Sequence, residues 1–232
     1  MSDSRAPILD AIRRSLRRGA LPAEEAAACE ARLANHARNP VPARATSLPP
    51  RERIALFVRM AEAVNATLTR VKRPEDVPAA VADYLAQFNL PPRLVRAPDP
   101  ALDALPWSAR PLLETRRGVA ERTDLVGVTG CFAAVAETGT LMLHSGAAGP
   151  TRNNFLPDTH IAVVRAGQVV ATYEDGWDRL REAHRGDGFA MPRTVNFITG
   201  PSRTADIEQK IELGAHGPRR LHIVLIDDGE AA

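Results

Sequence analysis

The runs LHIVLI at residues 221–226 and VNFIT at residues 195–199 decide the fold class of this chain. Both are short and largely apolar, which is typical of strands in a sheet that is covered on both faces. Strands that alternate with helices predict an α/β domain, and the step Ala166-Gly167 between two such runs predicts an antiparallel hairpin. The other expected strands lie at 93–96, 125–129, 140–144, 160–165 and 168–172, and helical spacing of apolar residues predicts helices at 175–184 and 204–213.

The first ninety residues are expected to be mostly helical. Their apolar residues recur three or four positions apart, and prolines such as Pro22 and Pro74 mark helix starts and linkers. Residues 43–50 end in a Pro pair and show no periodicity, so they predict a connector. We therefore predict an N-terminal helical arm at 1–45 and an α/β domain at 46–232. The helices expected in the first part lie near 5–18, 22–38, 51–70 and 75–88.

The composition excludes several classes of protein. The 232 residues are 44% hydrophobic and 25% charged, which is enough for a core without disulfides or metals. A net charge of +2, with the basic residues spread along the chain, argues against a nucleic-acid binder. Two cysteines, Cys29 and Cys131, cannot hold an iron–sulfur cluster, and no zinc motif occurs. Because no apolar run reaches the ~18 residues of a membrane span, we expect a cytoplasmic protein without a metal or cofactor of its own.

The segment GPSRTADIE at residues 200–208 is the first candidate site. It is expected to join a strand to a helix, and a helix N-terminus offers free N–H groups and a positive dipole to an anion. Arg203 would add a guanidinium, and Ser202 and Thr204 hydroxyls. This pattern predicts a site for a phosphate or a carboxylate. In the alternative interpretation, Ser202 or Thr204 is only a helix cap and Asp206 only a partner of the helix dipole.

Glu137 is the second candidate. It stands alone in the apolar segment 125–146, ahead of Thr138-Gly139-Thr140. A carboxylate in apolar surroundings is costly unless it is hydrogen-bonded, paired or used in chemistry, so Glu137 is a candidate base or nucleophile. Arg152 and Arg203 are its candidate counter-charges. The alternative is a turn carboxylate that neighbouring hydroxyls and amides satisfy.

Two loops carry further candidates. His216 and Gly217 form a tight turn before the last strand, where the histidine either binds an anion or caps the turn. In the loop from residue 149, three polar side chains, Arg152, Asn153 and Asn154, could reach a ligand.

Four other histidines receive different interpretations. Asp158 and His160 either pair with each other or bracket a turn. His222 lies inside an expected strand and is interpreted as structural, whereas His36 and His184 lie on expected helices and are interpreted as solvated.

Four motifs, in this order, resemble the LUD-domain family and, within it, the lactate utilization protein C subfamily. They are ETGT at 137–140, LPDTHI at 156–161, GPSRTADIE at 200–208 and HGP at 216–218, in a region of about 118–227. The resemblance implies a fold similar to that of sugar-phosphate isomerases and CoA transferases. We therefore expect an α/β fold with a Rossmann-like sheet sandwiched by helices and with an N-terminal helical extension.

The resemblance also implies a function, the oxidation of L-lactate to pyruvate together with partner proteins that carry iron–sulfur clusters. In the leading hypothesis this chain is a subunit that recognises a small carboxylate. Two alternatives stay open: a stand-alone enzyme of the CoA transferase or sugar-phosphate isomerase type with Glu137 as the catalytic residue, and a non-catalytic assembly module. The expected anion- or substrate-binding residues are Thr138, Gly139, Thr140, Arg152, Gly200, Ser202, Arg203, Thr204, Asp206, His216 and Gly217.

Overall fold

The computed structural model describes residues 4–38, 40–185, 191–205 and 211–227. The chain forms two compact units, residues 1–40 and residues 41–232. The first holds helices α1 (Arg5–Ser15) and α2 (Ala23–Asn35), neither of which has a buried residue. Both predicted helices are therefore confirmed, although each is shorter than expected. His36 ends α2 as its left-handed C-cap rather than lying inside the helix.

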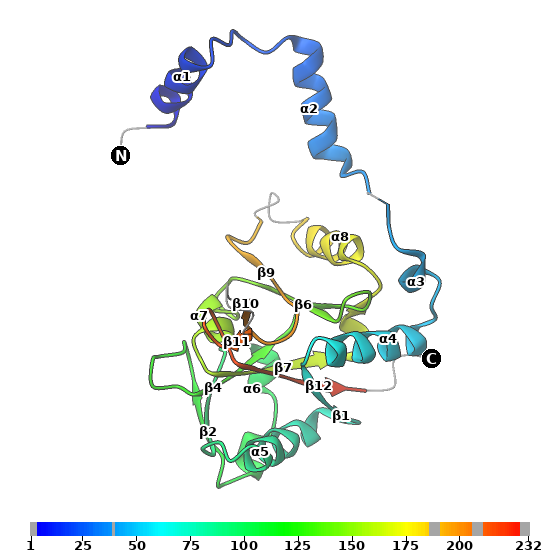
Figure 1. Cartoon of the computed structure of the whole chain (residues 1–232), viewed down its shortest axis with the longest axis vertical. Helices are drawn as coiled ribbons and strands as arrows, with labels where there is room; N and C mark the ends of the chain where they lie inside the picture. The colour runs from blue at the N-terminus through cyan, green and yellow to red at the C-terminus, as the bar shows by residue number, and fades with distance from the viewer. Residues whose placement is uncertain (1–3, 39, 186–190, 206–210, 228–232) are drawn as a thin grey trace. The chain divides into compact units, whose positions relative to one another are not determined.

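A six-stranded sheet forms the centre of the second unit, and all its paired strands are parallel. This confirms the predicted α/β class (Figure 1). The run LHIVLI lies inside the sheet and pairs on both sides, which explains its continuous apolar character. The strand order is β1 (Thr67–Val71), β12 (Arg220–Ile226), β7 (Thr159–Arg165), β4 (Val126–Gly130), β2 (Arg93–Arg96) and β3 (Glu114–Arg117).

Each face of this sheet is covered by a different layer, because successive strand residues point to opposite faces. Val224 and Ile226 of β12 pack with helix α5 (Val77–Gln87) and the short helix α6 (Pro100–Asp103). Ile223 and Leu225 pack on the other face, with helix α4 (Pro50–Ala63) and with a second sheet. Phe57 of α4 is fully buried there, a burial that contributes about 1.5–3 kcal/mol.

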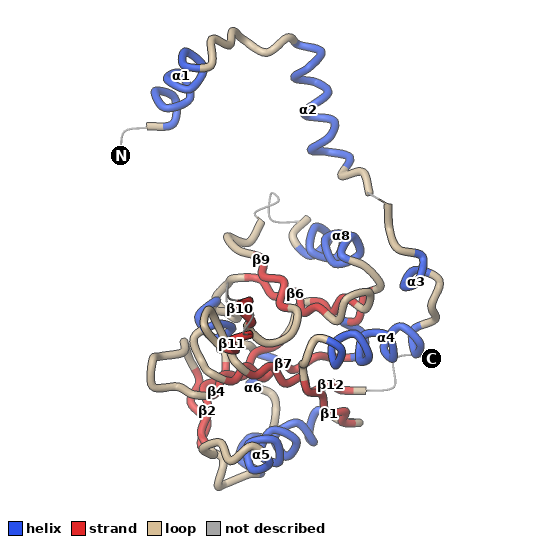
Figure 2. Tube along the Cα trace, viewed as in Figure 1, coloured by secondary structure: helices blue, strands red, loops and turns tan. Residues whose placement is uncertain are grey.

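The second sheet has four strands and carries the remaining predicted runs (Figure 2). The run VNFIT lies here as β9, antiparallel to β6, and not in the central sheet. Helix α8 (Tyr173–Ala183) contacts this sheet, and the five-residue helix α7 (Thr151–Phe155) precedes β7. The strands, in order, are β8 (Val169–Val170), β5 (Ala133–Val135), β6 (Thr140–His144) and β9 (Val195–Ile198).

Three element predictions are wrong. The predicted hairpin at 166–167 is a 3-10 turn (Ala166–Gln168) that carries the chain from one sheet to the other. The predicted helix at 51–70 ends near Asn65, a residue with φ of 67°, and the strand β1 follows it. The described ends of the predicted helix at 204–213 are antiparallel strands, β10 (Arg203–Ala205) and β11 (Ile211–Leu213).

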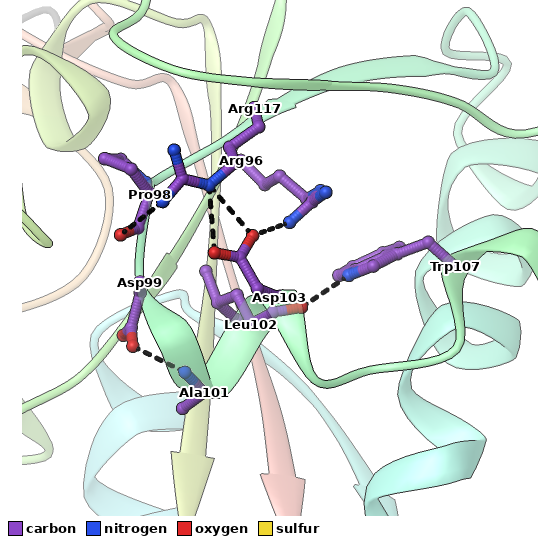
Figure 3. A network of polar contacts seen from close by, with 8 residues as sticks. All are labelled: Arg96, Pro98, Asp99, Ala101, Leu102, Asp103, Trp107 and Arg117. Atoms are coloured by element: carbon purple, nitrogen blue, oxygen red, sulfur yellow. Dashed lines mark hydrogen bonds and ion pairs between the residues drawn. The ribbon is translucent and has the colours of Figure 1, made fainter.

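Polar contacts fix the segment that follows β2 (Figure 3). Asp103, at the end of α6, pairs with Arg96 and with Arg117 of the edge strand β3, the latter at 2.9 Å. The Trp107 indole N–H donates to the Leu102 carbonyl at 2.7 Å. Asp99 caps α6 by accepting from the Ala101 N–H at 2.9 Å. The carboxyl end of β2 is thereby held to the edge strand. In the part of the chain that the structure describes, every helix is too short or too polar to cross a membrane.

Candidate functional site

A cavity of about 260 Å³ lies where β7 and β12 begin, next to the chain that leaves β9. Five residues predicted as anion-binding line it: Gly200, Ser202, Arg203, His216 and Gly217. The structure therefore brings GPSR and HGP, two motifs thirteen or more positions apart, to one site. The other residues that line the cavity are Asn154, Phe155, His160, Phe197, Ile198, Thr199, Pro201, Pro218 and Leu221.

Main-chain hydrogen bonds through Ser202 join the two motifs. The Ser202 N–H donates to the Pro218 carbonyl at 2.8 Å, and the Ser202 carbonyl accepts from the Gly214 N–H at 3.0 Å. The Ser202 hydroxyl accepts from the His216 N–H at 3.4 Å. Ser202 is thus not a helix cap but the link between both walls of the cavity. Residues 203–205 form a strand, so the described part of this segment does not offer the expected helix N-terminus.

Gly200 holds the turn that leads into this wall. Its φ is +74°, and a Cβ atom at this position would lie 2.2 Å from the Val64 carbonyl oxygen at the end of α4. Only glycine satisfies both conditions at once. The cavity wall therefore rests directly on the end of α4.

His160 reaches the cavity from the central sheet. The side chain is fully buried, and its Nε2 lies 2.8 Å from the Thr129 hydroxyl of β4. Nδ1 is buried and has no hydrogen-bond partner among the described residues. Burial lowers the pKa of His160 to about 4, so the ring is uncharged near neutral pH. The predicted pairing with Asp158 is wrong, since Asp158 instead faces Arg219, with 3.7 Å between Oδ2 and Nε.

Asn154 is the other buried polar group of this wall. It is 3% exposed and lines the cavity beside His160. A second cavity of about 260 Å³ shares Asn154 and lies at the carboxyl ends of β2 and β4. Asp99, Thr129 and His144 are its other polar residues. The pair Thr129–His160 thus lies between two cavities, with one residue in the wall of each.

Glu137 lies elsewhere and has partners of its own. Its side chain is 5% exposed, and Oε1 accepts a hydrogen bond of 3.1 Å from the Tyr173 N–H in the first turn of α8. Its carbonyl accepts from Arg44 at 2.6 Å. Among the described ion pairs, none joins Glu137 to Arg152 or Arg203, the predicted counter-charges. These contacts are those of a turn carboxylate that caps a helix. A catalytic role stays a prediction.

The three residues after Glu137 also make structural contacts. Thr140 is fully buried, and its hydroxyl lies 2.7 Å from those of Thr138 and Thr199 and 2.9 Å from that of Tyr173. Gly139 has φ of +68°, and a Cβ atom here would lie 2.2 Å from the Ala61 backbone nitrogen. The cluster reaches the cavity only through Thr199, which lines it.

Among the described residues, the remaining predicted ones do not line the cavity. Arg152 is exposed on α7 and lines neither cavity. Asn153 is fully buried. Its side-chain oxygen accepts from the Ala120 N–H, and its side-chain N–H donates to the Gly118 carbonyl, at 2.9 Å each. Thr204 pairs in β10 with Glu212. Asp206 lies outside the described residues.

Two of the three histidines interpreted from their elements alone have ring partners. His222 is buried on the opposite face of the central sheet, where its Nδ1 lies 2.9 Å from the Thr67 hydroxyl and its ring stacks on Tyr84. The structural interpretation of His222 is thus confirmed. His184, interpreted as solvated, is half-buried and packs edge-on against His144.

Comparison with known proteins places these residues in a family. The sequence model described as the LUD domain matches residues 54–226, which include the candidate cavity. Two similar proteins are each named "Lactate utilization protein C": that of Deinococcus radiodurans is 38% identical over 107 residues (46% of this chain and 48% of that protein), and that of Macrococcus caseolyticus is 34% identical over 128 residues (55% and 54%). The chain spans about half the length of the curated relatives it matches.

One solved structure shows the same fold. It is the crystal structure of a DUF162 family protein from Deinococcus radiodurans, with a TM-score of 0.56 and 24% sequence identity. The match covers 77% of this chain and 99% of that chain. The sequence match, which spans the central sheet, the second sheet and the cavity, shows that the chain belongs to the LUD domain family.

Proposed function

We propose that this chain acts in lactate utilization, as a subunit that binds lactate or pyruvate through its carboxylate in the cavity between residues 200–203 and 216–218. The relatives named "Lactate utilization protein C" support the pathway. The oxidation of L-lactate to pyruvate is assigned to partner proteins that carry iron–sulfur clusters, as the family resemblance implies. The chain supplies the recognition of the small anion.

The observation that carries this proposal is the set of hydrogen-bond donors around the cavity. Arg203 provides a guanidinium that can hold a carboxylate with two parallel hydrogen bonds. His160 and Asn154 are buried polar side chains that line the cavity, and His160 Nδ1 has no hydrogen-bond partner among the described residues. The volume of about 260 Å³ falls below the ~300–1,000 Å³ that is typical of pockets for drug-sized ligands. A three-carbon acid suits this size.

Binding is tested by thermal unfolding of the purified chain with L-lactate, pyruvate, inorganic phosphate or coenzyme A. A ligand that binds only the folded state raises the melting temperature by mass action. We expect L-lactate or pyruvate to stabilise the protein and coenzyme A to have no effect. Stabilisation by coenzyme A alone would instead favour an acyl-transfer enzyme.

The matched variants are Arg203→Ala and Arg152→Ala, because both arginines are exposed but only Arg203 lines the cavity. Loss of a hydrogen bond to a charged group costs about 1.5–3 kcal/mol, so Arg203→Ala should weaken L-lactate binding roughly 10- to 100-fold. Arg152→Ala should bind like the wild type in isothermal titration calorimetry. Equal affinities in the two variants would remove Arg203 from the site.

Growth on L-lactate tests the function in cells. A strain that lacks this gene should regain growth with the wild-type chain or Arg152→Ala, and grow poorly with Arg203→Ala at equal protein level. Full growth with Arg203→Ala, in a protein that binds neither L-lactate nor pyruvate, would refute the proposal.

A further inference from the structure

The single described hydrogen bond of the His160 side chain is the evidence for where its ring proton lies. The ring is fully buried at the start of β7, and Thr129, 3% exposed on β4, is the only described residue that bonds its side chain. The contact joins Nε2 to the Thr129 hydroxyl oxygen at 2.8 Å. Nδ1 has no partner among the described residues, and the histidine lines the candidate cavity.

The two possible tautomers differ in how many polar groups they leave unpaired. If Nε2 held the proton, it would donate to Thr129, the Thr129 hydroxyl would lack an acceptor, and Nδ1 would lack a donor. If Nδ1 holds the proton, the Thr129 hydroxyl donates to Nε2, and the only hydrogen left over is that on Nδ1. The first tautomer leaves two polar groups unpaired and the second only one, and because buried polar groups are almost always paired, the second tautomer is favoured. Its unpaired N–H belongs to a residue of the cavity wall.

We infer that His160 holds its ring proton on Nδ1 and donates it to the carboxylate of a ligand in the cavity, and that Thr129 fixes this tautomer through its hydroxyl. The inference about the ligand rests on the proposed function. The inference about the tautomer does not, because it concerns the protein without ligand. Thr129 is then a positioning residue, since it acts on the ligand only through His160.

The chemistry of the cavity selects a class of ligand. Among the described residues that line it, Arg203 is the only one with a guanidinium or ammonium group. His160 adds a hydrogen bond without a charge, because burial lowers its pKa to about 4. One fixed positive charge with uncharged donors suits a singly charged carboxylate better than a doubly charged phosphate ester. We therefore assign the cavity to monocarboxylates.

Nitrogen-15 NMR of the ring of His160 tests the tautomer directly, in the wild-type protein without ligand at neutral pH. The shift and the one-bond proton coupling should show a protonated Nδ1 and an unprotonated Nε2. A protonated Nε2 would overturn the inference. Thr129→Ser keeps the hydroxyl and should keep this pattern, whereas Thr129→Val removes the hydroxyl and should lose it.

Binding of L-lactate tests the consequence. Thr129→Val should weaken L-lactate binding about tenfold, and Thr129→Ser should bind within about twofold of the wild type. Inorganic phosphate should compete poorly with L-lactate in the wild type. Wild-type affinity in a folded Thr129→Val protein, or phosphate that binds more tightly than L-lactate, would overturn the assignment.

The two proposals can fail separately. If the wild type binds neither L-lactate nor pyruvate, the proposed function fails, while the NMR measurement still decides the tautomer. If L-lactate binds and Arg203→Ala weakens it, but Nε2 holds the proton of His160, the proposed function stands and this inference is wrong.

Discussion

Glu137 illustrates how one residue can invite two interpretations that only three-dimensional contacts separate. Its isolation among apolar residues is a property of the sequence, but its partner, the Tyr173 N–H, is 36 residues further along the chain. No local pattern connects the two positions. Arg203 and His216, in contrast, could be singled out because each is a charged or polar residue in a glycine-containing turn, and both line the cavity.

Glu137→Gln tests the capping role at this position. The amide oxygen can still accept from the Tyr173 N–H, but the negative charge at the start of α8 is lost, so we expect a decrease of about 0.5–2 kcal/mol in the free energy of unfolding. Growth on L-lactate should persist. Urea unfolding, with the exposed Glu182→Gln as a control on the same helix, measures the effect. Abolished growth with unchanged stability would show a catalytic carboxylate.

Gly139→Ala and Gly200→Ala should each destabilise the protein by roughly 2–4 kcal/mol. Both glycines have positive φ, and a Cβ atom at either one would lie 2.2 Å from the backbone of α4 or of its C-cap, Val64. Gly146→Ala is the control, since no atom lies within 4 Å of its added Cβ. Thermal unfolding compares the three. An equal, small effect at all three positions would contradict the close packing.

At the scale of elements, a strand is easiest to predict from sequence where its environment is uniform along its length. The central strand β12 is buried from Leu221 to Ile226, so its apolar run is visible without knowledge of its neighbours. The sequence does not predict the edge strands β1 and β3. Each is unpaired on one side, and their sequences, TLTRV and ETRR, contain charged and polar residues in place of an apolar run. The register of β4 beside β7 brings Thr129 close to His160, and sequence alone does not contain that register.

The N-terminal cap of helix α8 should contribute measurably to the free energy of unfolding. Thr172 caps the helix, its hydroxyl accepts from the Asp175 N–H, and the Asp175 carboxylate accepts from the Thr172 N–H. Thr172→Ala should lower the free energy of unfolding by about 1 kcal/mol. The exposed Thr46→Ala, which loses only a hydroxyl contact with Ala43, should change it far less. Circular dichroism during thermal unfolding compares the two variants, and equal melting temperatures would argue against the cap.

At the scale of the whole molecule, two buried histidines make stability depend on pH. Burial lowers the pKa of His160 and of His222 from 6.5 to about 4, on opposite faces of the central sheet. Between pH 6.5 and 4 the unfolded chain binds protons that the folded chain does not. The free energy of unfolding should therefore fall as the pH falls through this range, by up to about 1.4 kcal/mol per pH unit for each histidine, and both contributions are absent above it.

Urea unfolding at several pH values checks this dependence. His222→Asn should flatten the slope, whereas the exposed His36→Asn should leave it unchanged. The Arg117 guanidinium lowers the pKa of Asp103 below its ordinary 3.8, so this pair loses its stabilising effect only at still lower pH. A stability that is flat between pH 6.5 and 4 would show that both rings are accessible to protons in the folded state.

The two glycines that touch α4 also have a consequence for protein engineering. One belongs to the turn between β5 and β6 and the other to the wall of the cavity, yet both rest on the last turn of the same helix or the residue that caps it. A mutant library that aims at a new ligand gains nothing from positions 139 and 200, because no side chain fits there. Diversity belongs at Arg203 and His216, which line the cavity. A backbone change at the end of α4 would displace both the cavity wall at Gly200 and the turn of the second sheet at Gly139, so the two would change together.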